Sequence, residues 1–278
     1  MTVRLLPISA AATSGIPCWV DLTTRQSERT QAFYQELFGW TFEAGGTIGV
    51  LDGEPTCGVL EIPEDARELP AHWFPYFRVN SFDHLAADPP TDGDVIWGPE
   101  TYGQRLATVA AVVDPHGAGF GLWESMGLSG FAGGRRHAPA WFELSTRHPA
   151  DIAKFYCQLF DCFPDSISAA GSAAYRVFAR PDVLLAGVVA SDTEPYWRVY
   201  FQVDDLSSSL IHAKALGATQ LAERVDLPIG GTALLRDPVG ALFGLIEPFR
   251  EELGPMDTEA TSMGATDDNA GYPTTLSL

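Results

Sequence analysis

The chain has 278 residues, of which 46% are hydrophobic and 11% aromatic, an ordinary content for a globular protein long enough for two domains. Its 36 acidic and 17 basic side chains give a formal net charge of −19, which repels nucleic-acid phosphates and anionic lipid headgroups and excludes both as partners. The first residues lack the apolar core of a signal peptide, and no later stretch resembles a membrane span, so we expect a cytoplasmic protein.

The first half of the chain predicts two short runs of strand, helix and further strands. Phe33, Tyr34, Leu37 and Phe38 recur at helical spacing, and the segment before them is short, β-branched and aromatic, as in a strand. The expected elements are a strand at 18–24, a helix at 27–38, a hairpin within 45–62, a strand at 73–79, a helix at 82–87, and strands near 95, 106–113 and 120–124.

The second half repeats the first. The segment Pro17-Cys-Trp-Val-Asp-Leu-Thr-Thr-Arg25 returns 122 residues later as Pro139-Ala-Trp-Phe-Glu-Leu-Ser-Thr-Arg147. The segment that begins Asp114-Pro-His-Gly-Ala returns as Asp237-Pro-Val-Gly-Ala, 123 residues later. A repeat of this length indicates a duplicated globular domain rather than a solenoid unit.

The repeat gives expected domain boundaries. The second copy predicts a helix that begins at Pro149, a strand at 197–203, a helix at 206–216 ended by Gly217, and strands near 221, 233–236 and 241–246. We expect a first domain at 15–126, a linker at 127–137 through which the domains pack, a second domain at 138–249 and a polar tail at 250–278.

The four cysteines show no Cys-x-x-Cys spacing. They are Cys18, Cys57, Cys157 and Cys162, each inside an apolar or helical run. We interpret them as small buried hydrophobic residues rather than as a disulfide or zinc framework.

A βαβββ unit used twice per copy, with Phe-Tyr-x-x-Leu-Phe on its first helix and Asp-Pro-x-Gly-Ala before its last strand, resembles the vicinal oxygen chelate superfamily. That superfamily includes glyoxalase I, extradiol dioxygenases and fosfomycin or bleomycin resistance proteins, and the tandem arrangement is similar to its two-domain glyoxalase-like members. The resemblance covers about 15–125 and 139–248. It implies an α+β fold of two tandem domains, each with paired βαβββ modules that form a curved mixed sheet around a cavity.

The resemblance also implies where metal ligands would stand, on the first strand, on the strand that opens the second half of each domain, and on the last strand. In this chain none of those positions holds a residue that can bind a divalent ion. They carry Trp19 and Trp141, Phe74 and Arg198, and Gly121 and Gly244.

Other candidate ligands do not fill these positions. None of the six histidines is expected on a strand facing the cavity. Glu124 and Glu247 are shifted by three residues to the opposite face of the last strands, and we expect them to be solvated strand-end charges. We therefore predict no metal and no cofactor.

An indole and a carboxylate stand together in each copy. Alternation on a strand places Trp19 on the face of Asp21, and Trp141 on the face of Glu143. Two interpretations stay open. Either the indole fills the place of the ion and the acid is a structural anchor, or both line a pocket in which the acid is a hydrogen-bond acceptor or general base, with a pKa raised by desolvation.

The rest of each pocket differs between the copies. The second copy adds Arg198, Tyr200 and Gln202 on one face, where Arg198 either neutralises Glu143 or anchors an anion or carbonyl. The first copy is more apolar, and a planar ligand could stack on its rings. The candidate catalytic residues are Glu143, Arg198 and Asp21, and the candidate ligand-binding residues are Trp19, Phe74, Tyr76, Trp123, Trp141, Tyr200 and Gln202. Of the two acids we favour Glu143 as the base, with Arg198 as the anchor for a developing oxyanion, because the first copy has Phe74 where the cation would stand.

Tyr102 and Arg105 lie in or beside a loop near the mouth of the first pocket. Ligand contact is one interpretation of these two residues, but we favour the other, that they are surface residues.

No Gly-x-Ser-x-Gly elbow, P-loop, dinucleotide fingerprint or His-Glu-x-x-His motif is present. The sequence favours a metal-independent protein of specialised metabolism, in antibiotic biosynthesis or resistance, that binds a small aromatic or apolar metabolite and transforms it by acid–base chemistry of hydroxylase, isomerase or cyclase type. Two alternatives remain: a non-catalytic drug- or metabolite-binding resistance protein, and a metal-dependent glyoxalase-like lyase or dioxygenase. A homodimer is left open.

Overall fold

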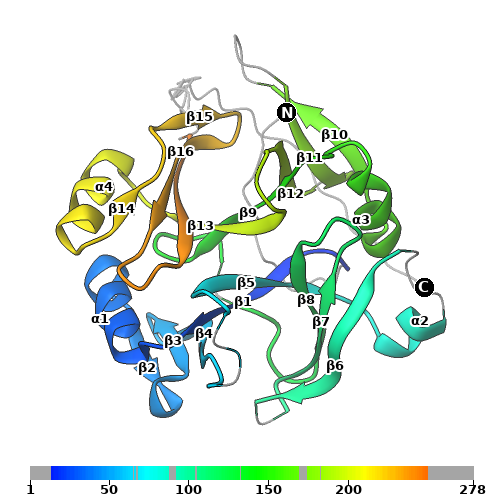
Figure 1. The fold of residues 1–278 in the computed structure, drawn as a ribbon, viewed down its shortest axis with the longest axis horizontal. Coiled ribbons are helices and arrows are strands. Elements are labelled where there is room, and N and C mark those ends of the chain that lie inside the picture. The colour runs from blue at the N-terminus through cyan, green and yellow to red at the C-terminus, as the bar shows by residue number, and fades with distance from the viewer. Residues whose placement is uncertain are drawn as a thin grey trace, which may run out of the picture.

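The computed structural model describes residues 14–249 except 65, 67, 88–91, 104, 132, 169–173 and 182 (Figure 1). The C-terminal tail expected at 250–278 lies outside these residues. Among the described residues no helix has the length and apolarity that crossing a membrane requires.

The first half of the chain forms a mixed sheet, here sheet A. Within the described residues it has eight strands in the order β2-β3-β4-β1-β5-β8-β7-β6. Its elements are β1 (Pro17–Thr24), α1 (Ser27–Phe38), β2 (Thr41–Glu43), the 3₁₀ turn η1 (Ala44–Gly46), β3 (Ile48–Leu51), β4 (Glu54–Glu61), β5 (His72–Arg78), α2 (Phe82–Ala87), β6 (Asp94–Tyr102), β7 (Ala107–Val113) and β8 (Gly119–Ser125).

The second half forms sheet B on the same plan. Its described strands run in the order β10-β11-β12-β9-β13-β17-β16-β14, and β15 also pairs with β16. Its elements are β9 (Pro139–Thr146), α3 (Ile152–Phe160), β10 (Phe163–Ile167), β11 (Tyr175–Arg180), β12 (Val183–Ala190), β13 (Tyr196–Gln202), α4 (Leu206–Ala215), β14 (Thr219–Gln220), β15 (Val225–Leu227), β16 (Gly230–Arg236) and β17 (Leu242–Pro248).

Each sheet consists of two βαβββ modules placed side by side, as the sequence predicts. In sheet A, β1 pairs in parallel with β4 and β5 pairs in parallel with β8, which closes each module. The antiparallel pair β1·β5 joins the two modules, and β9·β13 does the same in sheet B. The first strand of each domain is therefore central in its sheet, and its side chains are buried on both faces.

Helix α3 begins three residues later than predicted. Pro149 precedes a turn in which the amides of Asp151 and Ile152 both donate to the His148 carbonyl, each at 3.2 Å, and the regular helix starts at Ile152. The helix ends at Asp161, whose left-handed backbone (φ 51°) closes the last turn.

Glu124 and Glu247 are not solvated charges as predicted. Glu124 Oε2 accepts a hydrogen bond from the Phe82 amide at 2.9 Å, and Glu247 Oε2 accepts one from the Leu206 amide at 3.1 Å. These amides open α2 and α4, where backbone N–H groups have no partner within the helix. The two glutamates therefore cap the second helix of each domain.

The two sheets share one continuous hydrophobic core, so their packing is not confined to the linker as the sequence suggested. The backs of β5 and β13 meet: the rings of Trp73 and Phe201 are 5.0 Å apart, and those of Phe77 and Trp197 are 4.8 Å apart. Helix α1 of the first domain also contacts α4 of the second, and the two lie beside each other in Figure 1.

Two buried hydrogen-bond relays cross from one domain to the other. Trp73 Nε1 donates to the Tyr34 hydroxyl at 3.0 Å, which donates to Asp237 Oδ2 of the second domain at 3.1 Å. Asp237 Oδ1 accepts the amides of Val239 and Ala241. The repeated motifs that mark the duplication thus form its interdomain contacts.

The second relay has the same form in the opposite direction. Trp197 Nε1 donates to the Tyr156 hydroxyl at 3.1 Å, and this hydroxyl donates to Asp114 Oδ2 of the first domain at 2.8 Å. Since each tyrosine hydroxyl has one donor and one acceptor as partners, both relays are saturated.

Two of the four cysteines depart from the prediction. Cys18 and Cys57 are buried, but Cys157 and Cys162 are half-buried, with their Sγ atoms 3.5 Å apart. The turn at the end of α3 causes this, because the Cys162 amide folds back onto the Cys157 carbonyl at 3.1 Å.

Candidate functional site

The central strand of each sheet, β1 or β9, carries a buried indole and a buried carboxylate. Trp19 and Trp141 are fully buried, Asp21 is 1% exposed and Glu143 is 2% exposed. Alternation along β1 and β9 puts each pair on one face, as predicted. The side chains surrounding the two carboxylates differ between the domains.

In the first domain, Asp21 accepts two hydrogen bonds on a single oxygen. Trp19 Nε1 donates to Oδ1 at 2.9 Å, and the Tyr102 hydroxyl donates to it at 2.8 Å. Oδ2 is buried without a hydrogen-bond partner of good geometry. Burial raises the pKa of Asp21, and the hydroxyls of Tyr76 and Tyr102 and the Trp19 indole oppose that rise.

In the second domain, Glu143 is paired and hydrogen-bonded at both oxygens. The Tyr175 hydroxyl donates to Oε2 at 2.6 Å, and the Tyr200 hydroxyl donates to Oε1 at 3.0 Å. Arg198 Nη1 donates to Oε1 at 2.8 Å and forms an ion pair. Trp141 Nε1 donates to the Tyr175 hydroxyl at 3.0 Å rather than to the carboxylate.

Arg198 connects this buried network to solvent. Its Nη2 donates to Ser145 Oγ and its Nε to the Tyr196 hydroxyl, both at 3.1 Å, while 18% of its side chain is exposed. Burial alone would lower the pKa of Arg198, but the Glu143 carboxylate raises it overall. Arg198 is therefore a permanent cation between the buried acid and solvent.

Glycines in the strands make room for these side chains. A Cβ on Gly58 would overlap Asp21 and Tyr102, and a Cβ on Gly187 would overlap the Tyr175 hydroxyl. Both glycines stand directly opposite the acid of their domain in the parallel pairs β1·β4 and β9·β12. The acid sites therefore require a residue without a side chain on the neighbouring strand.

The positions that would supply metal ligands by resemblance do not fit a metal ion. Gly121 and Gly244 carry no donor, and a Cβ there would overlap the rings of Tyr76 and Tyr200 on the paired strands. Trp19 and Trp141 fill the first-strand positions as buried rings. Across the described ranges, no three His, Cys, Asp or Glu side chains lie close enough together to hold an ion.

The candidate ligand-binding residues fall into two groups. In the first domain, Trp19 stacks on Trp123 with 5.6 Å between the ring centroids. The centroid of the Tyr76 ring lies 5.9 Å from that of Trp123 and 5.3 Å from that of the half-buried Phe74. These rings line one continuous aromatic wall beside Asp21.

In the second domain, Trp141 and Tyr200 belong to the network around Glu143. Gln202 lies apart from it, at the end of β13, where its backbone bonds to His137 and Ala138 of the chain entering β9.

Two tyrosines of the site were not expected there. Tyr102, expected on the surface, reaches Asp21 from the end of β6, whereas Arg105 is exposed as predicted. Tyr175, absent from the candidate list, reaches Glu143 from β11. Repeated glycines inside two strands, Gly58 and Gly187, are the sequence signal that could have indicated a large side chain close by.

Comparison with known proteins identifies the family. The family described as a glyoxalase-like domain matches residues 141–246, which form most of sheet B. The anthracycline biosynthesis protein DauV of Streptomyces sp. strain C5 is 31% identical, over 84% of this chain and 93% of that protein. The protein CFP32 of Mycobacterium bovis is 28% identical, over 89% of this chain and its own full length.

A solved structure has the same fold. The Mn(II)-bound glyoxalase of Novosphingobium aromaticivorans superimposes with a TM-score of 0.58 at 12% identity, covering 85% of this chain and 83% of that one. With its duplicated βαβββ modules and a close relative over most of its length, the chain belongs to the glyoxalase-like proteins of the vicinal oxygen chelate superfamily.

Proposed function

We propose that this protein binds a planar, largely apolar metabolite of specialised metabolism and moves a proton on it with a buried carboxyl group, without a metal ion. The observation that carries the proposal is Asp21, a buried acid whose Oδ1 is held by two donors and whose Oδ2 has no hydrogen-bond partner of good geometry, although the nearby Tyr76 hydroxyl lowers its pKa. An unpartnered buried oxygen is costly unless a ligand or a proton satisfies it.

The surroundings of Asp21 suit proton transfer. Burial raises its pKa, which makes the carboxylate a stronger base than a solvated aspartate. The Trp19 N–H and Tyr102 O–H hold Oδ1 and leave Oδ2 to receive a proton from an acidic C–H or O–H group of a ligand. The aromatic wall of Phe74, Tyr76 and Trp123 would accept a flat ring beside it.

The sequence favoured Glu143 as the base, with Arg198 as an anchor for a developing oxyanion. The geometry favours Asp21 instead, because both oxygens of Glu143 are engaged and its charge is paired with Arg198. In the second domain we assign to Arg198, the partly exposed member of the network, the role of binding a carbonyl or phenolate oxygen at the cavity opening.

The ligand class rests on two supports. The aromatic side chains beside Asp21 would offer fused rings a stacking surface, and a relative over most of the chain bears the name of an anthracycline biosynthesis protein. Metal independence rests on the donor set, since the ligand positions carry Trp, Phe, Arg and Gly.

Deuterium exchange at an acidic C–H tests the acid–base proposal. We would incubate 2-tetralone, a bicyclic aromatic ketone, with protein in D₂O and follow loss of its α-proton signal by NMR. The protein should accelerate exchange over buffer, Asp21→Asn should remove at least about 10²-fold of that acceleration, and the matched Glu143→Gln should retain it. Loss in Glu143→Gln alone would place the base in the second domain.

A second function is favoured by the saturated network around Glu143. A cavity whose acid is fully satisfied can hold a ligand without turning it over, as in a sequestering resistance protein. This candidate predicts that 2-tetralone exchanges no faster with protein than in buffer, while aromatic compounds still quench the tryptophan fluorescence.

A further inference from the structure

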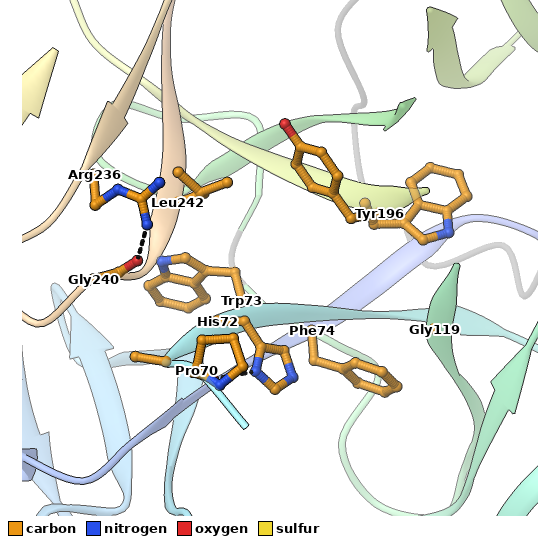
Figure 2. A pocket seen from close by; sticks show the side chains of 11 residues that line it. Pro70, His72, Trp73, Phe74, Gly119, Tyr196, Arg236, Gly240 and Leu242 are labelled. Carbon is orange, nitrogen blue, oxygen red and sulfur yellow. Dashed lines mark hydrogen bonds between the residues drawn. The ribbon is translucent and has the colours of Figure 1, made fainter. Parts of the chain in front are cut away.

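A groove lies where the two domains meet, and neither Asp21 nor Glu143 is among its lining residues (Figure 2). Its volume is about 380 Å³, within the size range of sites for small organic ligands. Residues at the starts of β5 and β13, with Trp73 and Trp197 among them, line it together with the repeated turns before β8 and β17. It therefore exists only because the duplicated domains pack back to back.

Aromatic side chains form the two long walls of this interdomain groove. Figure 2 shows Phe74 on the wall from the first domain and Tyr196 on the wall from the second, with Trp73 to one side of them, next to Gly240. Phe74 and Tyr196 are half-buried, and Trp73 is buried. A flat ring placed between the walls would meet aromatic surface on more than one side.

Charge distinguishes the two ends of the groove. Arg236 stands at one end, where its Nη1 donates to the Gly240 carbonyl at 3.2 Å, and Gly119 stands at the other. The residue that precedes the repeated Asp-Pro motif in the first copy, equivalent to Arg236, is Val113. The pseudo-symmetric groove thus carries a guanidinium at one end only.

The described residues that line the groove include no carboxylate, although the chain as a whole carries a formal charge of −19. His72, half-buried on the first-domain wall, adds an imidazole whose Nδ1 lies 2.9 Å from the Pro70 carbonyl oxygen. An acid-free groove with a cation at one end favours an anion in an otherwise anionic protein.

We infer that the interdomain groove binds a planar aromatic compound of about two or three fused rings that carries one anionic group. The rings lie between Phe74 and Tyr196, and the anion points to Arg236. Neither Asp21 nor Glu143 lines the groove, so the inference stands whether or not those acids act in catalysis. The groove does share side chains with their surroundings, because Phe74 packs against Tyr76 and the Tyr196 hydroxyl accepts a bond from Arg198.

Anthraquinone-2-sulfonate is a suitable probe, and isothermal titration calorimetry measures its affinity and stoichiometry. Arg236→Gln should weaken binding by about tenfold or more, the effect of losing a hydrogen bond to a charged group. The same substitution should leave the affinity of uncharged 2-methylanthraquinone unchanged. The matched control is Arg147→Gln, an exposed arginine that pairs with Glu194 and does not line the groove. This variant should bind both compounds as the parent protein does.

A second variant tests the position of the rings. Gly119→Leu adds a side chain whose Cβ lies 3.3 Å from the Phe74 ring, so it should fill the neutral end and abolish binding of both compounds. Arg236 is exposed, so Arg236→Gln keeps the fold and decides the charge argument even if Gly119→Leu does not fold. Unchanged sulfonate affinity in Arg236→Gln, or equal weakening in Arg147→Gln, would overturn the inference.

Discussion

Replacing Tyr34 by Phe removes one hydroxyl that joins the two domains. The change strands Trp73 Nε1, a buried donor, and takes from Asp237 Oδ2 the hydrogen bond that crosses the interface. A hydrogen bond to a charged group contributes about 1.5 to 3 kcal/mol, and an unsatisfied buried donor costs about 1 to 3 kcal/mol. We expect Tyr34→Phe to lower the free energy of unfolding by about 3 kcal/mol.

Tyr156→Phe should cost a similar amount, because it strands Trp197 and removes the bond to Asp114. The two relays share no residue, so the double variant should lose close to the sum of the two losses. Urea denaturation measures these losses, and each single loss corresponds to a fall in Tm of about 6 to 12 °C.

Tyr196→Phe is the matched control. Its half-exposed hydroxyl accepts a bond from Arg198, so its loss should cost less than about 1 kcal/mol. Burial raises the pKa of Asp237 and the Tyr34 bond lowers it, so this pKa should be higher in Tyr34→Phe than in the wild type. The stability deficit of the variant should therefore be full above its own, higher Asp237 pKa and shrink as the pH falls through that value. A loss in Tyr34→Phe no larger than in the control would refute the relay as an interdomain contact.

Three further predictions concern the acid cavity, metals and thiols. Burial raises the folded-state pKa of Asp21, so the wild type should lose stability relative to Asp21→Asn as the pH rises from about 4 through that pKa; a stability difference that stays constant with pH in urea titrations would contradict this. Purified protein should contain no stoichiometric Fe, Mn, Zn or Ni by elemental analysis, and chelator should not change 2-tetralone exchange; a tightly held metal whose removal abolishes exchange would contradict it. Diamide, a thiol oxidant, should join Cys157 and Cys162 in a disulfide, seen by mass spectrometry after alkylation, while the buried thiols of Cys18 and Cys57 stay reduced; a Cys157→Ser variant should show no such bond.

Strand periodicity, a local property, predicted the inward pairs Trp19 with Asp21 and Trp141 with Glu143, since residues two apart on a strand share a face. The same local patterns predicted the βαβββ modules and α1 to the residue, because apolar spacing and a terminal glycine determine such elements within one segment. The repeated motifs predicted the duplication. Sequence spacing also indicated that the usual ligand positions carry no metal donor.

Only the tertiary structure decided which groups satisfy the two acids. Tyr102 lies 81 residues from Asp21, on β6 at one edge of sheet A, and Tyr175 lies 32 residues from Glu143, on β11 in sheet B. Local periodicity carries no information about such pairings. The bonds of Tyr34 and Tyr156 cross to the other domain for the same reason. The packing of two sheets with similar sequences decides where the domains leave a groove. It also decides which acid keeps an oxygen without a hydrogen-bond partner of good geometry.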